Sequence, residues 1–517
     1  MRMKLTEKLM VMVIVLAVFL VLPLGIVQAQ PQEGGDLTIA MGADPESLDP
    51  IEVSSSPAAM VMMHTMETLF DMTPDGEIVP LLAEGYDVSD DGLRYDIYLN
   101  EGVEFHDGTY LDAEVVKYNL ERFQDEEAPF SFLITEIVDI EVIDDYTVRL
   151  HTERPFAPLM AHLSHDFISM VSPTAVEEMG EEFSVNPVGT GPFEFVSWSR
   201  GEEINMVRFD DYWGENAYVD NLTFKIVPED STRVVMVETG EADATMFVPP
   251  RERGRLEETE GVNVVQVPSV RTIYAGFNVT VEPFDDPLVR RALNYAVDNE
   301  SIVEQVMQGA GRPSDAPISP DIFGYAQQER YEYNPERAEE LLAEAGYEDG
   351  FEMTFHHPVG RYMMDDVIAQ AVQSQLADVG VDVNLQTLEW ATYLEFMNVY
   401  PEESEHELFI LGWGTVTGDA DYGLYALFHS DEWVPYGSNR SYYGMDEVDQ
   451  LLEEARINPD PEAREEIYAE AIELIWEDAP WIFLHSEVQI NAVRDNVEGL
   501  IHHPREYISA REAYFTD

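Results

Sequence analysis

The sequence of 517 residues contains no cysteine. Disulfide bonds, thiolate metal sites, cysteine nucleophiles and a lipid-modified N-terminal cysteine are therefore excluded. It also lacks the G-x-S-x-G motif of serine hydrolases and the H-E-x-x-H motif of zinc proteases. A convergent catalytic triad leaves no fixed sequence pattern. Because no feature of the sequence indicates an enzyme, we predict no catalytic residue, no metal site and no cofactor.

Basic residues are also scarce. Lys and Arg together number 28 against 102 Asp and Glu, which gives a net charge of -74. This excess of acid opposes binding to nucleic acid, whose backbone carries charge of the same sign. It also makes a compact chain repel itself in dilute buffer, whereas the Debye length shrinks to about 3 Å at 1 M salt. We interpret the charge as adaptation to high salt, because a content of 45% hydrophobic residues argues against disorder.

The chain has one long apolar run, at its N-terminus. Arg2, Lys4 and Lys8 precede an almost wholly apolar stretch over residues 9–24, and the small residues Val27 and Ala29 follow. This order is typical of a secretory signal peptide. We predict cleavage after Ala29 and a periplasmic mature protein. An uncleaved membrane anchor is the alternative, because the run approaches the length of a membrane span.

The rest of the chain alternates between strand and helix patterns. A strand is predicted over residues 37–41, and apolar alternation predicts strands over 93–99 and 138–150. Asn334 as a helix cap, Pro335 in the first helical position and Gly346 beyond the end predict a helix. A strand, helix and strand over residues 351–388 indicate a βαβ unit. Two amphipathic helices are predicted over 446–456 and 461–478.

Several short motifs occur in one order along the chain and resemble one family. They are Gly-Gly-Asp-Leu over 34–37, Phe-His-Asp-Gly-Thr over 105–109, Gly-Thr-Gly-Pro-Phe over 189–193, Tyr212-Trp213, the stretch 233–243 and the stretch 286–298. They are similar to those of extracellular solute-binding proteins of the dipeptide, oligopeptide and nickel type, which are receptors of ATP-driven importers. The resemblance implies an α/β, two-lobed periplasmic binding protein fold of the class II type, with an extra α+β subdomain.

We expect the following division of the chain: a signal peptide over 1–29, a first segment of lobe 1 over 30–60, an extra subdomain over 61–187, a second segment of lobe 1 over 188–275, lobe 2 over 276–485 and a C-terminal segment of lobe 1 over 486–517.

The stretch 409–428 is the strongest candidate for a ligand site. An apolar run over 409–411 predicts a buried strand, which leads into a loop with Gly412, Asp419 and Asp421. In α/β folds the ligand crevice lies beyond the carboxyl ends of the strands. An aspartate among aromatic side chains is partly desolvated and favours a cationic partner such as an ammonium group. A solvated turn in an acid-rich chain is the alternative interpretation.

A receptor for a zwitterionic peptide needs a carboxylate, a guanidinium and aromatic walls. Asp419 is the predicted partner of the ammonium group, as the family resemblance also implies. Asp421 is its rival, because residues 418–421 depart from the family's commoner Asp-x-x-x-Pro form. Arg361, in a Pro/Gly loop after a predicted strand, is the predicted partner of the carboxylate, and a surface salt bridge is its alternative role. The predicted walls, which are otherwise core residues, are Trp390, Trp413, Tyr274 and Tyr422.

The resemblance implies a monomeric receptor that captures short peptides by hinge closure and delivers them to the permease of an ABC importer. The sequence of residues 415–425, together with Gly-Arg-Tyr over 360–362, resembles the corresponding sequences of the glutathione-binding branch of the family. A nickel-chelate receptor is an alternative, with histidine pairs at 356–357 and 502–503, but adjacent residues on a strand point to opposite faces. An oligosaccharide receptor is a second alternative, and the presence of Arg361 argues against it.

Overall fold

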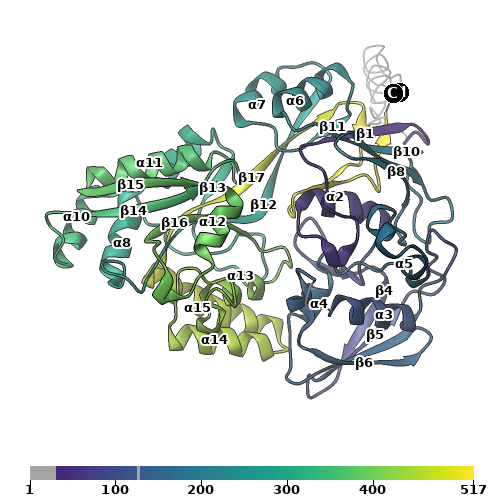
Figure 1. Ribbon diagram of the computed structural model, residues 1–517, viewed down its shortest axis with the longest axis horizontal. Helices are drawn as coiled ribbons and strands as arrows, with labels where there is room; N and C mark the ends of the chain where they lie inside the picture. The colour runs from purple at the N-terminus through teal and green to yellow at the C-terminus, as the bar shows by residue number, and fades with distance from the viewer. Residues whose placement is uncertain (1–30, 125–127, 517) are drawn as a thin grey trace, which may run out of the picture.

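The computed structural model describes residues 31–124 and 128–516 (Figure 1). Its described residues form one large mixed sheet of eleven strands and a separate antiparallel sheet of four. In the large sheet β13 (Gly311–Pro313) pairs only with β17. The order of the other strands is β15 (Val381–Leu388), β14 (Phe351–Pro358), β16 (Leu408–Gly414), β12 (Val262–Phe277), β17 (Trp481–Arg494), β11 (Ala244–Thr245), β1 (Asp36–Met41), β10 (Asn221–Ile226), β9 (Glu203–Arg208) and β8 (Phe193–Ser199).

Two bodies lie on either side of the long strands β12 and β17 (Figure 1). We call the body that contains β1 and β8 to β11 lobe 1, and the body that contains β13 to β16 lobe 2. Lobe 1 also contains α2 (Ser56–Thr65), α6 (Asp230–Thr239), α7 (Pro250–Glu257) and the C-terminal strands β18 (Val497–Glu498), β19 (Ile501–His503), β20 (Tyr507–Ser509) and β21 (Tyr514–Phe515). The α/β two-lobed architecture is the one predicted from the sequence.

The two lobes share β12 and β17. Residues 262–268 of β12 pair with 488–494 of β17 in lobe 1, and residues 272–276 pair with 481–486 in lobe 2. The register shifts between Pro268 and Thr272, where proline supplies no N–H to the ladder. This irregularity marks the passage between the lobes. The division expected from the sequence has lobe 2 begin at residue 276 and end at residue 485, and both positions lie within these two strands.

Lobe 2 contains the predicted βαβ unit. β14 and β15 are parallel neighbours, and α11 (Asp365–Asp378) packs on both. Asn334 caps α10 (Pro335–Glu344) by accepting the backbone N–H of Arg337, so this predicted helix is confirmed. The other helices of lobe 2 are α8 (Pro287–Ala296), α9 (Asn299–Ser301), α12 (Trp390–Met397), α13 (Ala420–Phe428), α14 (Asp446–Ile457) and α15 (Pro461–Asp478).

The extra subdomain is built on the four-stranded sheet. Its strands, in order, are β4 (Ala83–Val88), β5 (Arg94–Leu99), β7 (Thr147–Thr152) and β6 (Ile137–Asp144). The alternation predicted over 138–150 is a hairpin, because a turn at residues 145–146 separates β6 from β7. The hairpin β2 (Phe70–Met72) and β3 (Ile78–Pro80) and the helices α3 (Ala113–Phe123), α4 (Leu159–Leu163) and α5 (Pro173–Met179) complete this part of the chain.

Buried apolar side chains form three clusters. One cluster joins lobe 1 to the extra subdomain, a second runs from α6 and α7 of lobe 1 along β12 and β17 into lobe 2, and the third lies mainly in lobe 2. Within the described ranges, every helix is too short or too polar to cross a bilayer. The predicted signal peptide lies outside the described residues. The second cluster therefore connects the two lobes along the strands that they share.

Candidate functional site

A cleft of about 520 Å³ lies between the lobes. The start of α2 forms part of its wall from lobe 1, and residues 165–167 belong to the extra subdomain. Lobe 2 contributes the loop after β14, the start of α12 and the end of β16. Six of the eight residues predicted from the sequence line this cleft: Arg361, Trp390, Trp413, Tyr422, Tyr274 and Gly412.

Arg361 lies in the loop that follows β14. The Asp365 carboxylate holds this loop by accepting the backbone N–H groups of Gly360, Arg361 and Tyr362 at 3.2, 2.9 and 3.2 Å. The Arg361 guanidinium carbon lies 5.0 Å from the centroid of Trp390 and 5.1 Å from that of Tyr362. Arg361 is exposed, and no carboxylate of the described chain forms an ion pair with it. The loop thus presents, on an aromatic support, a guanidinium without an ion-pair partner among the described residues.

The aromatic walls depend on a close approach at Gly412. A Cβ atom there would lie 2.5 Å from Ile273 and 2.8 Å from the Tyr362 ring, so only glycine lets Tyr362 pack against β16. Tyr274 is fully buried at the base of the cleft and stacks on Trp481, with ring centroids 3.5 Å apart. The predicted aromatic residues therefore both line the cleft and belong to the surrounding core.

Three further arginines line the cleft, and the sequence interpretation missed them: Arg271, Arg440 and Arg505. Arg505 donates to Ser164 O at 2.8 Å and to Asp166 Oδ1 at 3.1 Å. Arg440 donates to Ser438 O at 3.1 Å and to Asn398 Oδ1 at 2.7 Å, and burial lowers its pKa. Arginines are scarce in this sequence, so each one was a candidate for a functional role. The sequence does not show which arginines lie close together in the folded protein. The cleft has four guanidiniums and one carboxylate, Asp166, along its lining.

Asp419 lies outside this cleft. It is 5% exposed, and its carboxylate caps α13 by accepting the backbone N–H of Asp421 at 3.0 Å. Arg464 Nη2 donates to both of its oxygens at 2.8 and 2.9 Å, and the Tyr468 hydroxyl lies 3.3 Å away. The residue of this loop that faces the cleft is Val416. The carboxylate of Asp419 is therefore occupied by its own protein.

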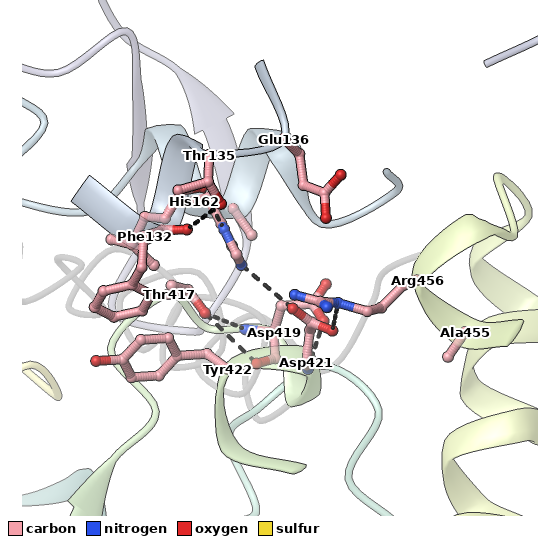
Figure 2. Close-up of polar contacts among 12 residues, drawn as sticks. Phe132, Thr135, Glu136, His162, Thr417, Asp419, Asp421, Tyr422, Ala455 and Arg456 are labelled. Carbon is pink, nitrogen blue, oxygen red and sulfur yellow. Dashed lines mark hydrogen bonds and ion pairs between the residues drawn. The ribbon is translucent and has the colours of Figure 1, made fainter. Parts of the chain in front are cut away.

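Asp421 also lies outside the cleft. Figure 2 shows its carboxylate between Arg456 and His162, whose side chain comes from α4 of the extra subdomain. The distances are 2.8 Å to Arg456 Nε and 3.5 Å to His162 Nε2. Burial raises the pKa of Asp421, but the charge of Arg456 and the contact with His162 outweigh burial and lower it to about 2. Asp421 thus connects lobe 2 to the extra subdomain.

The histidine pairs do not meet at the cleft. His356 and His357 are buried on β14, where His357 Nδ1 lies 2.8 Å from Pro358 O. His503 Nε2 lies 2.8 Å from Met72 O. Among residues 31–124 and 128–516, no group of three or more His, Cys, Asp and Glu side chains could hold a metal ion.

Comparison with known proteins identifies the family. A model of the bacterial extracellular solute-binding proteins, family 5 Middle, matches residues 77–435. The glutathione-binding protein GsiB of Salmonella paratyphi A is 34% identical over 469 residues, which cover 90% of this chain and 91% of that protein.

Solved structures agree in fold. The periplasmic binding protein DppA of Helicobacter pylori, in complex with the peptide STSA, is 30% identical with a TM-score of 0.80, and the match covers 94% of this chain and 99% of DppA. The dipeptide-binding protein of Pseudoalteromonas sp. SM9913, in complex with Met-Leu, is 25% identical with a TM-score of 0.80. This match covers 93% of this chain and 100% of that protein. The chain therefore belongs to the bacterial extracellular solute-binding proteins of family 5.

Proposed function

We propose that the protein is the substrate-binding component of an ABC importer and that it captures short peptides, glutathione among them, in the cleft between its lobes. The observation that carries this proposal is the guanidinium of Arg361, which lies on the rings of Trp390 and Tyr362 and has no ion-pair partner among the described residues. A guanidinium in this setting suits the carboxylate of a peptide, because it can donate two parallel hydrogen bonds. The names of the relatives, GsiB and two peptide-bound receptors, support a peptide as the ligand.

The cleft has the size of a small-molecule site. Its volume of about 520 Å³ falls in the range of roughly 300 to 1,000 Å³ that is usual for ligand pockets. The aromatic walls accept varied side chains, while the arginines fix the charged ends of a ligand. This division of roles suits a receptor that binds peptides of a few residues.

Binding proceeds by hinge closure in this proposal. The two lobes are joined by β12 and β17, whose register is irregular at residues 268–272. A ligand that contacts both lobes binds the closed arrangement more tightly than the open one and so shifts the population toward it. The closed lobes then present a joint surface to the permease. No covalent step is involved.

The cellular setting is part of the same proposal. The apolar N-terminal segment acts as a signal peptide that is removed after Ala29, and the mature protein is a periplasmic monomer adapted to high salt. Removal of residues 1–29, which contain three bases and one acid, changes the net charge from -74 to -76. The family's description as extracellular solute-binding proteins supports export.

Mass spectrometry of small molecules that co-purify with the mature protein in molar salt tests the proposal. Calorimetric titration with glutathione, several dipeptides, an oligosaccharide and a nickel-histidine complex follows. We expect mass spectrometry to identify a bound peptide with a free carboxylate, or the titration to show that such a peptide binds with micromolar affinity. Binding of only the sugar or only the nickel complex would overturn the peptide assignment.

A further inference from the structure

A second cavity, of about 570 Å³, adjoins the cleft. Both share the start of α2 and the side chains of Arg271, Arg361 and Tyr362 as lining. Its other lining residues include Glu487 and Gln489 of β17, and Glu506 of the C-terminal segment. This second cavity is therefore placed to receive one end of a ligand whose other end lies in the cleft.

Two carboxylates of this cavity share the guanidinium of Arg271. Arg271 donates from Nε and Nη2 to the two oxygens of Glu506, each at 2.8 Å. Glu487 is the second carboxylate beside this guanidinium, with its Oε2 atom 3.5 Å from Arg271 Nε. Its side chain is 11% exposed. Because Glu506 takes both short contacts of Arg271, Glu487 keeps only the longer one, and a cationic group of a ligand would give Glu487 a closer partner.

Gln489 adds an unsatisfied acceptor two residues along β17. Its side chain is 2% exposed, and its Nε2 atom donates to His503 O at 3.1 Å, which fixes the orientation of the amide. Its Oε1 atom is buried and accepts no hydrogen bond from any described residue. A buried acceptor without a donor costs free energy. A ligand N–H group in this cavity would remove that cost.

We propose that the second cavity is an ammonium subsite, in which a free α-ammonium group of the ligand donates to Glu487 and to Gln489 Oε1 while its carboxylates bind Arg361 and Arg440 in the cleft. This assignment rests on the proposed function and deepens it. The ligand is then a zwitterion with separated ends, as in a short peptide or a γ-glutamyl peptide.

Other acidic groups are less suited to this role. Asp419 and Asp421 are paired with arginines outside the cleft, and Asp166 is paired with Arg505. Burial and the charge of Glu506 raise the pKa of Glu487 to about 7, although Arg271 and Arg361 act in the opposite direction. A carboxylate in such surroundings gains more from a cationic ligand than a carboxylate that already has its own arginine.

The test is a titration of variants against matched ligands. Glutathione and two dipeptides are compared with their N-acetyl derivatives, which lack the ammonium charge, on the full mature protein and on Glu487→Gln. We expect the wild type to bind the free-amine form at least about tenfold more tightly than the acetylated form, as for loss of one charge-assisted contact. Glu487→Gln should reduce this ratio toward one by weakening only the free-amine ligand.

Two further variants sharpen the test. Exposed Glu304 provides the control Glu304→Gln, which removes one carboxylate elsewhere in lobe 2 and should leave the ratio unchanged. The double variant Glu487→Gln/Gln489→Glu moves the carboxylate by two residues and should recover part of the preference for the free amine.

Two results would overturn the subsite. One is an unchanged preference in Glu487→Gln with a wild-type melting temperature, and the other is an equal loss of affinity for both forms of the ligand. A wild type that binds none of the peptides would instead refute the proposed function, and the subsite with it.

Discussion

Arg464 donates from a single nitrogen, Nη2, to both carboxylate oxygens of Asp419, at 2.8 and 2.9 Å. Both side chains are almost completely buried, and Asp419 also caps α13. A buried ion pair is costly to break, because the remaining charge is left without a partner. This pair ties the loop after β16 to α15. It therefore explains why the Asp419 side chain does not reach into the cleft.

Asp419→Ala should therefore act on stability. We expect a loss of about 3 to 5 kcal/mol in the free energy of unfolding, because Arg464 is left buried and unpaired. Denaturant unfolding in molar salt measures this loss. The double variant Asp419→Leu/Arg464→Met, which removes both charges, should recover most of it. If Asp419→Ala is as stable as the wild type but loses ligand affinity, the original prediction of an ammonium partner is correct.

Arg361→Ala should act on binding. We expect at least a tenfold loss of affinity for a carboxylate-bearing peptide, because a charge-assisted hydrogen bond is worth about 1.5 to 3 kcal/mol. Arg361→Lys should recover only part of the loss, since an ammonium group cannot reproduce the planar fork. Arg330→Ala, which removes an exposed arginine paired with Glu300, is the control. Calorimetry with equal affinities for Arg361→Ala and the control would contradict the role of Arg361.

Local signals in the sequence were sufficient for much of the fold. Asn334 and Pro335 specify the start of α10, and the apolar runs on either side of α11 specify β14 and β15. These signals act within a few turns of chain, so their outcome does not depend on distant residues. The family resemblance supplied the two-lobed arrangement, which local patterns do not determine.

The site could be predicted only in part. Arg361 and Trp390 follow β14 and β15, and Trp413 lies near the end of β16, so strand patterns were enough to place these three residues near the cleft. Arg440, Arg505 and Glu487 lie in segments without a motif, and only the tertiary fold brings them to the cleft or its neighbouring cavity. Asp419 caps α13, and the sequence could not separate this role from a ligand role because an aspartate after a glycine is compatible with both. Its partner Arg464 lies 45 residues further along the chain.

Asp421 should make stability depend on acid pH. Its folded pKa of about 2 lies below the value of about 3.9 expected in the unfolded chain. A depressed pKa contributes stability that is fully present above about pH 4 and is lost as the pH falls through about 2. The shift corresponds to about 3 kcal/mol.

The measurement is unfolding free energy against pH for the wild type and Asp421→Asn, which cannot ionise. The slope between pH 4 and pH 2 should be smaller in Asp421→Asn, whatever its stability at neutral pH. Exposed Asp431 provides the control Asp431→Asn, which should keep the wild-type slope. Identical slopes in all three proteins would mean that the contacts with Arg456 and His162 do not lower the pKa of Asp421.

Salt should stabilise the whole fold while affecting ligand affinity much less. The net charge of -74 makes exposed carboxylates repel one another in dilute buffer, and this repulsion is screened when the Debye length falls from about 10 Å at 0.1 M to about 3 Å at 1 M. We therefore expect the melting temperature to rise steadily between 0.1 and 2 M KCl. Salt screens buried contacts such as that of Arg271 with Glu506 far less. The same holds for the contacts of a ligand that is enclosed by such residues.

Calorimetric scans and titrations across the same salt series check both parts. Repetition of the scans at pH 4, where about half of the exposed carboxylates are protonated, should give a weaker dependence on salt, because the repulsion itself is smaller. A melting temperature that is highest in dilute buffer would refute adaptation to high salt. A ligand affinity that falls by orders of magnitude with added salt would indicate binding by long-range attraction at an open surface. An arginine cleft that closes around its ligand predicts instead that affinity comes from short, desolvated contacts that added salt screens little.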